Sequence, residues 1–288
     1  MIRTKIFKKE HLNRTLAKRG FVVLDGLSQN QISVLNDVYH TDRPNCSVGG
    51  FQSTHFYKDI EYKRRVNRAI IGEFEGFIEN HLVNYRPIFG NFMVKEAEGK
   101  GEMPLHADWT YVDESRYVSL GFWIPLIDTN ERNGRIGVVP RSHLIQTPER
   151  GPQIKSPFQE LNAYIAKKYG KFLNLKAGQV LIYNHKTLHF SMPNYSAVER
   201  VAINLVCVPN DAKLVHYARL KDNKSISYFE PSSTEFYIDY ELFGIPKEPA
   251  VIEDIPYNDE QFDKLDVDKK FKMNPVSYWL NSMFSGCQ

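Results

Sequence analysis

The 288-residue chain has little cysteine and no long apolar run. Its three cysteines, Cys46, Cys207 and Cys287, form no close pair and give an odd count, so we expect no disulfide framework, and a reducing cytoplasm is the simplest setting. No apolar stretch approaches the ~20 residues that a membrane helix requires, so no membrane partner is expected. The basic N-terminal segment also lacks the apolar run of a secretory signal.

The chain also lacks a strong charge of either sign, internal repeats and low-complexity segments. A net charge of +3 is too small to indicate a nucleic-acid partner. The composition, 42% hydrophobic and 13% aromatic, allows a sizeable core and fits one large β domain with additions. Length and composition therefore agree with a soluble enzyme, and they leave the oligomeric state open.

Periodicity predicts mainly helices before residue 85 and mainly strands after it. Leu12 and Leu16 indicate the inward face of a first helix, residues 20–25 read as a buried strand, and Ser28 is a typical N-cap for a helix to about Tyr39. Apolar residues at helical spacing predict a long helix over about 59–81. Short strands bounded by turn residues are predicted at 88–97, 116–127, 135–139, 172–175, 179–184 and 200–208, with a helical insertion centred on FQELNAYIAKKY.

A row of short strands favours a jelly-roll barrel over a doubly wound sheet. Residues 41–57 contain turn residues and aromatics without a period, which indicates either an ordinary loop or an active-site lid. After residue 209 the pattern is least regular. EFYIDYELFG reads as helix or strand, KEPAVIEDIPYNDEQF reads as loop, and NPVSYWLNSMF has an apolar stripe that must pack on another part of the protein.

The tripeptide His106-Ala-Asp108 is the first candidate for chemistry. On an extended strand, residues i and i+2 point to the same face, so His106 and Asp108 could hold one ion. Two imidazoles and one carboxylate can occupy one face of a ferrous ion and leave other positions open. A lone His-x-Asp is weak evidence, because it also occurs by chance as a surface histidine beside a solvated aspartate.

The sequence around this tripeptide resembles the phytanoyl-CoA dioxygenase (PhyH) family of iron- and 2-oxoglutarate-dependent oxygenases. The resemblance covers roughly residues 18–209. The matching residues, in order, are Trp123, Pro125, Leu126, Asp128, Asn133, Gly134, Val139, Pro140, Ser142, His143, Ala177, Gly178, His189 and Arg200. It departs at Arg141, where the family usually has glycine, and at Gln179, where it usually has an acidic residue. We expect a residue with a Cβ atom at position 141 to carry a backbone cost.

The resemblance implies a mainly β fold with flanking helices, the double-stranded β-helix, with helices packed on one side. Residues 1–209 would form the oxygenase domain with its N-terminal helical part, and residues 210–288 an extension that packs on the barrel and is not a separate catalytic domain. We assign no chemistry to that extension.

The second histidine ligand is chosen from His143, His185, His189 and His216. The resembled family uses the histidine at the position of His143 structurally, and strand parity does not separate His185 from His189. Because the family's co-substrate arginine follows the distal histidine by about ten to fourteen residues, the eleven-residue spacing from His189 to Arg200 favours His189. The predicted metal ligands, and catalytic residues, are therefore His106, Asp108 and His189.

Arg200, Ser191 and Trp123 are the predicted co-substrate residues. 2-Oxoglutarate has a distal carboxylate, which would be costly to bury without a partner, and a guanidinium can bind it with two parallel hydrogen bonds. Ser191 occupies the position of a family hydroxyl that assists this arginine. Trp123 could line the same cavity or could be plain core.

The implied cofactors are Fe(II), 2-oxoglutarate and O2, and the implied reaction is hydroxylation of a C–H bond in a small polar metabolite or natural-product intermediate. Two alternatives remain: a cupin-type metal enzyme that does not use 2-oxoglutarate, and a non-catalytic jelly roll that binds a metabolite. If residues 109–117 and 41–57 meet over the metal, charges from Arg43, Asp113, Glu114 and Arg116 would mix with His55 and aromatic side chains at the entrance, which favours a polar or zwitterionic substrate.

Overall fold

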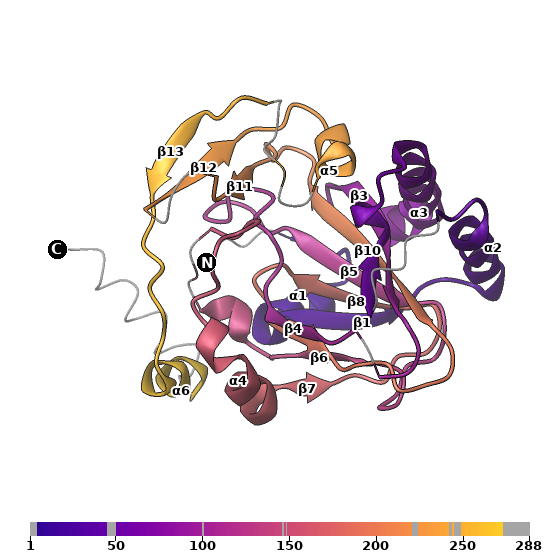
Figure 1. The fold of residues 1–288 in the computed structure, drawn as a ribbon, viewed down its shortest axis with the longest axis horizontal. Coiled ribbons are helices and arrows are strands. Elements are labelled where there is room, and N and C mark those ends of the chain that lie inside the picture. Colours follow the sequence, from indigo (N-terminus) through magenta and orange to yellow (C-terminus); the bar gives the residue numbers. More distant parts are fainter. Residues whose placement is uncertain are drawn as a thin grey trace.

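The computed structural model describes residues 5–44, 50–99, 101–145, 147, 149–220, 224–241, 244 and 249–272 (Figure 1). Two antiparallel sheets form its centre. The six-stranded sheet has the order β1 (Phe21–Asp25), β8 (Gln179–Asn184), β5 (Leu120–Pro125), β10 (Arg200–Pro209), β3 (Tyr85–Lys95) and β2 (Phe51–Ser53). The four-stranded sheet has the order β4 (Met103–His106), β9 (His189–Ser191), β6 (Ile136–Val138) and β7 (Lys171–Phe172).

The two sheets pack face to face. Trp123 of β5, Leu181 of β8 and Ala202 of β10 form one apolar cluster with Ile136 and Val138 of β6. Because alternate residues of a strand point to opposite faces, the neighbours of these residues point away from the cluster. This arrangement confirms the predicted mainly β, double-stranded β-helix architecture.

Three helices cover the outer face of the six-stranded sheet: α1 (Glu10–Arg19), α2 (Gln29–His40) and α3 (Ile60–His81). The predicted cap is present, since Ser28 and Gln31 form a reciprocal capping box at the start of α2. Asp59 accepts a hydrogen bond from the Tyr62 amide and begins α3 in the same way. These helices agree with the sequence expectation to within a residue or two.

Helices also cover the other sheet, so the expectation of helices on one side alone was wrong. The short 3-10 helix η3 (Gln159–Leu161) leads into α4 (Asn162–Tyr169), and α6 (Lys264–Lys272) lies beside it. Ile165 of α4 and Val267 of α6 share a cluster with Leu105 and Phe190, which point outward from β4 and β9. Both faces of the sandwich need cover because the outward residues of both sheets are apolar.

The segment after β10 forms a small sheet of β11 (His216–Ala218), β12 (Ser225–Phe229) and β13 (Glu253–Pro256), and a short helix α5 (Glu235–Asp239). EFYID is helical, which is one of the two alternatives that the sequence left open, whereas β13 is a strand within the segment that was expected to be a loop. The stripe NPVSYWLNSMF lies outside the described residues. Among the helices described, none is long and apolar enough to cross a membrane.

Candidate metal centre

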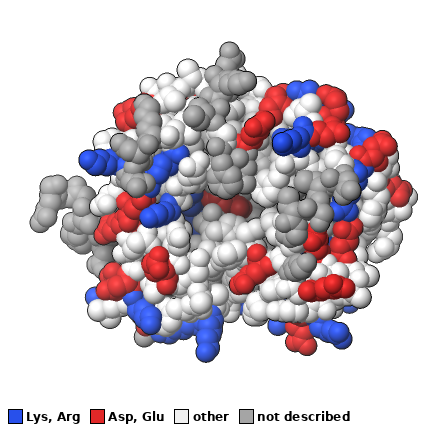
Figure 2. Space-filling model, viewed as in Figure 1, with Lys and Arg blue, Asp and Glu red and all other residues white. Residues whose placement is uncertain are grey.

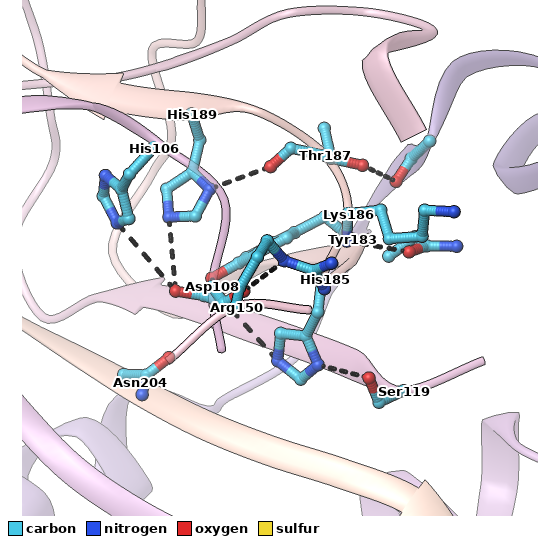
Figure 3. Close-up of polar contacts among 12 residues, drawn as sticks. His106, Asp108, Ser119, Arg150, Tyr183, His185, Lys186, Thr187, His189 and Asn204 are labelled. Atoms are coloured by element: carbon cyan, nitrogen blue, oxygen red, sulfur yellow. Dashed lines mark hydrogen bonds and ion pairs between the residues drawn. The ribbon is translucent and has the colours of Figure 1, made fainter. Parts of the chain in front are cut away.

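Two histidines and an aspartate meet at one end of the sandwich. β4 pairs with β9 so that His106 lies directly opposite His189, and Asp108 follows two residues after β4 ends (Figure 3). Asp108 Oδ1 is 3.9 Å from His106 Nε2 and 3.7 Å from His189 Nε2. One ligand atom from each residue lies within 4.8 Å of the other two. The expectation that His106 and Asp108 share a strand was wrong in detail, yet the turn after β4 still brings their side chains together.

Backbone carbonyls orient both imidazoles. The Nδ1 atom of His106 is 2.7 Å from the Pro104 carbonyl oxygen, and the Nδ1 atom of His189 is 3.0 Å from that of Thr187. A carbonyl only accepts, so each Nδ1 carries the proton and each Nε2 keeps a free lone pair. The two lone pairs face the Asp108 carboxylate, as metal ligands require.

The second oxygen of Asp108 has a different environment. Tyr183 donates a 2.7 Å hydrogen bond to Asp108 Oδ2, and His185 Nε2 lies 3.9 Å from the same oxygen. Ser119 Oγ, 2.8 Å from Nδ1, holds the His185 ring (Figure 3). These contacts orient the carboxylate and leave Oδ1 toward the two other candidate ligands.

The protonation states of His106 and Asp108 favour binding of a cation. Burial, and next the neighbouring His189, lower the pKa of His106 to about 4, so this ring is neutral at neutral pH. Burial acting alone would raise the pKa of Asp108, but His189, His185, His106 and the Tyr183 hydroxyl bring it below its ordinary value. Neutral imidazole and ionised carboxylate are the forms that bind metal.

The remaining histidines have other positions. His143, in the 3-10 helix η2 (Ser142–Leu144), lies 3.1 Å through Nε2 from the Ala17 carbonyl, as expected for a structural residue. His216 is fully buried among aromatic rings beyond the metal ligands. His185 lies in the turn after β8, not on a strand with His189, so the parity comparison did not apply. It faces Asp108 Oδ2, away from Oδ1, the oxygen nearest the other two ligands.

Arg200 is a buried cation without an acidic partner in the described part of the chain. It begins β10, is 1% exposed, and donates one 3.3 Å hydrogen bond from Nη1 to the Met93 carbonyl. Its Nε has no partner among the described residues. Burial lowers the pKa of Arg200 to about 9, which still leaves the group charged at neutral pH. A buried charge of this kind is costly unless an anion compensates it.

Lys95 lies next to Arg200, directly opposite it in the β3–β10 register. Its Nζ donates to the carbonyls of Gly101, Ser191 (3.3 Å) and Met192 (2.7 Å). Three acceptors match the three N–H bonds of an ammonium, whereas burial and then repulsion by Arg200 lower the pKa of Lys95 to about 6. A bound anion at this position would restore the ammonium form, because it would offset the repulsion.

Ser191 and Trp123 lie on inward faces near this pair. Ser191 is two residues after His189 on β9, so the two side chains share a face, and it is 8% exposed. The guanidinium carbon of Arg200 lies 5.4 Å from the centre of the Trp123 ring, and Trp123 belongs to the cluster between the sheets. Neither residue is among the described residues that line the cavity beside the metal ligands.

A cavity of about 380 Å³ opens beside His106 and Asp108. Figure 2 shows a hollow near the middle of this face of the molecule. Most of the lining is apolar, and aromatic side chains from several parts of the chain contribute to it. Besides histidine rings, these side chains are Phe51, Phe56, Phe89, Trp109, Tyr111, Phe158, Tyr237 and Tyr257.

The expectation about the cavity entrance was correct for the segments that meet there and wrong for the charges that they bring. Trp109 and His55 line the same cavity, with ring centres 6.3 Å apart, so the two predicted segments do meet. The expected charges do not line it: Arg43 pairs with Glu199, and Glu114 pairs with Arg150. Besides Asp108, the charged residues at the cavity are Glu149, Arg150 and Lys155. The described part of 41–57 forms a wall, because β2 pairs with the edge of β3.

Sequence reasoning missed Tyr183, Lys95 and Asn204, as well as Tyr237 and Tyr257 from the C-terminal extension. Tyr183 had a usable signal, since it alternates with Leu181 on a predicted strand that precedes His189. Lys95 could have been noticed as the charged end of an otherwise apolar strand. Tyr237 and Tyr257 gave no local signal, because only the folded chain brings them to the cavity.

Comparisons with known proteins agree with this geometry. The model of the family described as phytanoyl-CoA dioxygenase (PhyH) matches residues 30–202. No curated protein sequence matched the chain.

Several solved structures share the fold. The epimerase SnoN in complex with Fe3+, alpha ketoglutarate and nogalamycin RO is 17% identical, with 86% of this chain and 95% of that chain covered and a TM-score of 0.54. HygX from Streptomyces hygroscopicus with nickel and 2-oxoglutarate bound is 13% identical, with 70% and 88% covered and a TM-score of 0.51. The alpha ketoglutarate dependent carbocyclase SnoK from nogalamycin biosynthesis is 16% identical, with 72% and 86% covered and a TM-score of 0.50.

Proposed function

Because the chain belongs to the phytanoyl-CoA dioxygenase (PhyH) family, we propose that it is an Fe(II)- and 2-oxoglutarate-dependent dioxygenase that hydroxylates a small molecule. The observation that supports this most directly is the convergence of His106, Asp108 and His189 around one point. Two imidazoles and one carboxylate on one side of the metal position are the donor set of non-haem Fe(II) oxygenases.

The residues fit iron. Both free Nε2 atoms and Asp108 Oδ1 are oriented by contacts that do not involve a metal, so the site is preorganised. Asp108 is intact, and relatives that halogenate replace this carboxylate with a small residue, which favours hydroxylation or another oxidation here. Bound iron would supply the oxidising chemistry, coupling decarboxylation of 2-oxoglutarate to succinate with oxidation of a substrate C–H bond by O2.

The residues also fit 2-oxoglutarate. Arg200 is a buried guanidinium with no anionic partner among the described residues, and Met93, whose carbonyl it contacts, lines the cavity beside His106 and Asp108. A carboxylate placed against Arg200 would remove the cost of its unpaired charge. Ser191 would offer a hydroxyl, and Trp123 would hold the guanidinium from behind.

The protein's remaining task is to place the substrate and exclude water. The cavity wall joins β2, β3, the segment after β4 and the C-terminal extension, since Phe51, Phe89, Trp109 and Tyr237 all contribute. We propose that residues 1–209 form the oxygenase domain and that the extension, residues 210–288, completes its substrate cavity. Such a wall would hold one C–H bond near the metal.

The first test measures metal and co-substrate together. Fe(II) should bind with a stoichiometry of one, and the loaded protein should convert 2-oxoglutarate to succinate in air. Asp108→Ala should abolish succinate formation while the circular dichroism spectrum stays unchanged. Metal binding at full stoichiometry in His189→Ala, with loss only in His185→Ala, would overturn the ligand assignment.

The second test concerns Arg200. Removing one partner of a buried charge pair typically costs about 3–5 kcal/mol, so Arg200→Ala should weaken 2-oxoglutarate binding by two to three orders of magnitude. Ser191→Ala should cost less, about 1–2 kcal/mol. Anaerobic calorimetric titration of the Fe(II)-loaded protein measures both, with Arg64→Ala, which breaks ion pairs of α3 with Glu235 and Asp239, as the control. Unchanged affinity in Arg200→Ala would favour a cupin-type enzyme that does not use 2-oxoglutarate.

A further inference from the structure

We propose that the substrate has a flat ring bearing a hydroxyl or N–H group, and that Asn204 accepts a hydrogen bond from that group. This inference rests on the proposed function, because it assigns the substrate class of the same site. It follows from two independent features of the cavity, a directional chain of hydrogen bonds and an aromatic wall.

Asn204 differs from every other residue of its strand. It is the one residue of β10 that is not buried, and it lines the cavity together with His106 and Asp108. On β10 it alternates with Arg200 and Ala202, so it shares their inward face, four residues nearer the cavity than Arg200. A polar amide at this position faces the space where a substrate would lie.

A chain of hydrogen bonds fixes which end of the amide is turned to the cavity. Asn204 Nδ2 donates to Asn91 Oδ1 at 3.0 Å, and Asn91 Nδ2 donates to Ser53 Oγ at 2.6 Å. The same Asn91 nitrogen lies 3.4 Å from the Phe92 carbonyl oxygen, where an amide oxygen would be repelled. The amide of Asn91 therefore cannot be reversed without cost, and the orientation of Asn204 follows from it.

The acceptor that remains is Asn204 Oδ1. In Figure 3 this oxygen points to the side of Asp108 and the nitrogen points away. An amide oxygen accepts hydrogen bonds and does not donate them, so the matching group is a hydroxyl or an N–H. An ether or ester oxygen at the same place would face the amide oxygen and would be disfavoured.

The walls around this acceptor favour a flat ring. Phe89 and Trp109 line the cavity with Phe56 and Tyr237, and the ring of His55 lies edge-on to both Phe89 and Trp109, with centres 5.0 and 6.3 Å apart. Aromatic side chains bind flat rings through stacked or edge-on contacts. A flexible acyl chain uses neither the edge-on geometry nor the acceptor.

Calorimetric titration with three probes tests the inference on the wild-type protein loaded anaerobically with Fe(II) and 2-oxoglutarate. The probes are 2-naphthol, which donates, 2-methoxynaphthalene, which has the same ring and only accepts, and dodecanoate, which has no ring. One net hydrogen bond of about 0.5–1.5 kcal/mol predicts that 2-naphthol binds roughly 3- to 10-fold more tightly than 2-methoxynaphthalene.

Variants at position 204 assign the effect to the amide oxygen. Asn204→Leu should remove the preference for 2-naphthol, whereas Asn204→Gln, which keeps an amide with both a donor and an acceptor, should retain it. Asn210 is an exposed asparagine that directly follows β10, so Asn210→Leu is the control and should behave as wild type. Measuring the preference in both variants guards against a fold defect in either one.

Three results would overturn the inference: equal affinity for the two naphthalenes, tighter binding of dodecanoate than of either, or a preference that persists in Asn204→Leu. The loading step separates this inference from the proposed function. If 2-oxoglutarate binds through Arg200 and the naphthol preference is absent, only the substrate class is wrong. If 2-oxoglutarate does not bind, the proposed function itself fails.

Discussion

At the scale of single residues, Asp108 has two oxygens in different environments. Oδ2 accepts from Tyr183 and faces His185, while Oδ1 faces the two candidate imidazole ligands. A carboxylate held through one oxygen cannot rotate freely, so the other oxygen keeps its position when no metal is bound. This difference between the two oxygens depends on Tyr183, which is 75 residues away in sequence.

At the same scale, Arg141 allows the free-energy cost of a positive φ angle to be measured. Its φ of +73° lies in the left-handed region, where the resembled family has glycine, and its amide donates to the Arg19 carbonyl. Arg141→Gly should be more stable than Arg141→Ala by about 1 kcal/mol, because only glycine adopts this φ without a Cβ penalty. Urea unfolding of both variants measures the difference. Equal stabilities would show that the loop relaxes around a Cβ atom at no cost.

At the scale of elements, the pairing of β5 with β8 creates the space for Tyr183. Gly121 lies opposite Tyr183 in the register, and a Cβ at position 121 would lie 2.4 Å from the tyrosine ring. A glycine on a fully buried central strand weakens the strand itself, so its presence points to a close approach. Here the close approach is the ring that holds Asp108.

Gly121→Ala should therefore displace Tyr183 and weaken metal binding. Loss of a group that orients a ligand typically lowers metal affinity about 10- to 100-fold, and Tyr183→Phe should act similarly by removing the hydrogen bond. Ni(II) titration measures the affinity of both variants. Tyr85→Phe is the control, since it removes a 2.8 Å hydrogen bond to the Val118 carbonyl away from the site. Metal affinity equal to that of Tyr85→Phe would contradict this role of Tyr183.

At the scale of the whole molecule, buried histidines couple folding to pH. Burial lowers the pKa of His143 to about 4 and those of His55 and His216 to about 3, from an ordinary value of 6.5. The unfolded chain therefore binds protons below pH 6.5 that the folded protein does not. Stability is greatest above pH 6.5 and falls as the pH drops toward 4.

Each such histidine should contribute a slope of about 1.4 kcal/mol per pH unit between pH 6 and about 4. His143→Gln should make the dependence of unfolding free energy on pH less steep, whereas Gln261→Asn, which changes no titrating group at an exposed position, should leave it unchanged. Urea unfolding of metal-free protein at a series of pH values gives the slopes. Identical slopes in the two variants would exclude His143 as a contributor.

The local sequence determined much of this protein. The spacing of His106, Asp108 and His189 within the family's ordered motif predicted a group that the fold brings together, and Ser28 predicted the start of a helix that the structure confirms. These features depend on short stretches of chain, where side-chain periodicity and capping act within a few residues.

Only the tertiary structure decided the surroundings of that group. The bond from Tyr183 to Asp108, the pairing of Lys95 with Arg200, and the chain from Ser53 through Asn91 to Asn204 all arise from strand register between distant segments. Tyr237 and Tyr257 reach the cavity from an extension whose sequence has no regular pattern. Register and packing between distant segments depend on the whole set of contacts, so no local pattern specifies them.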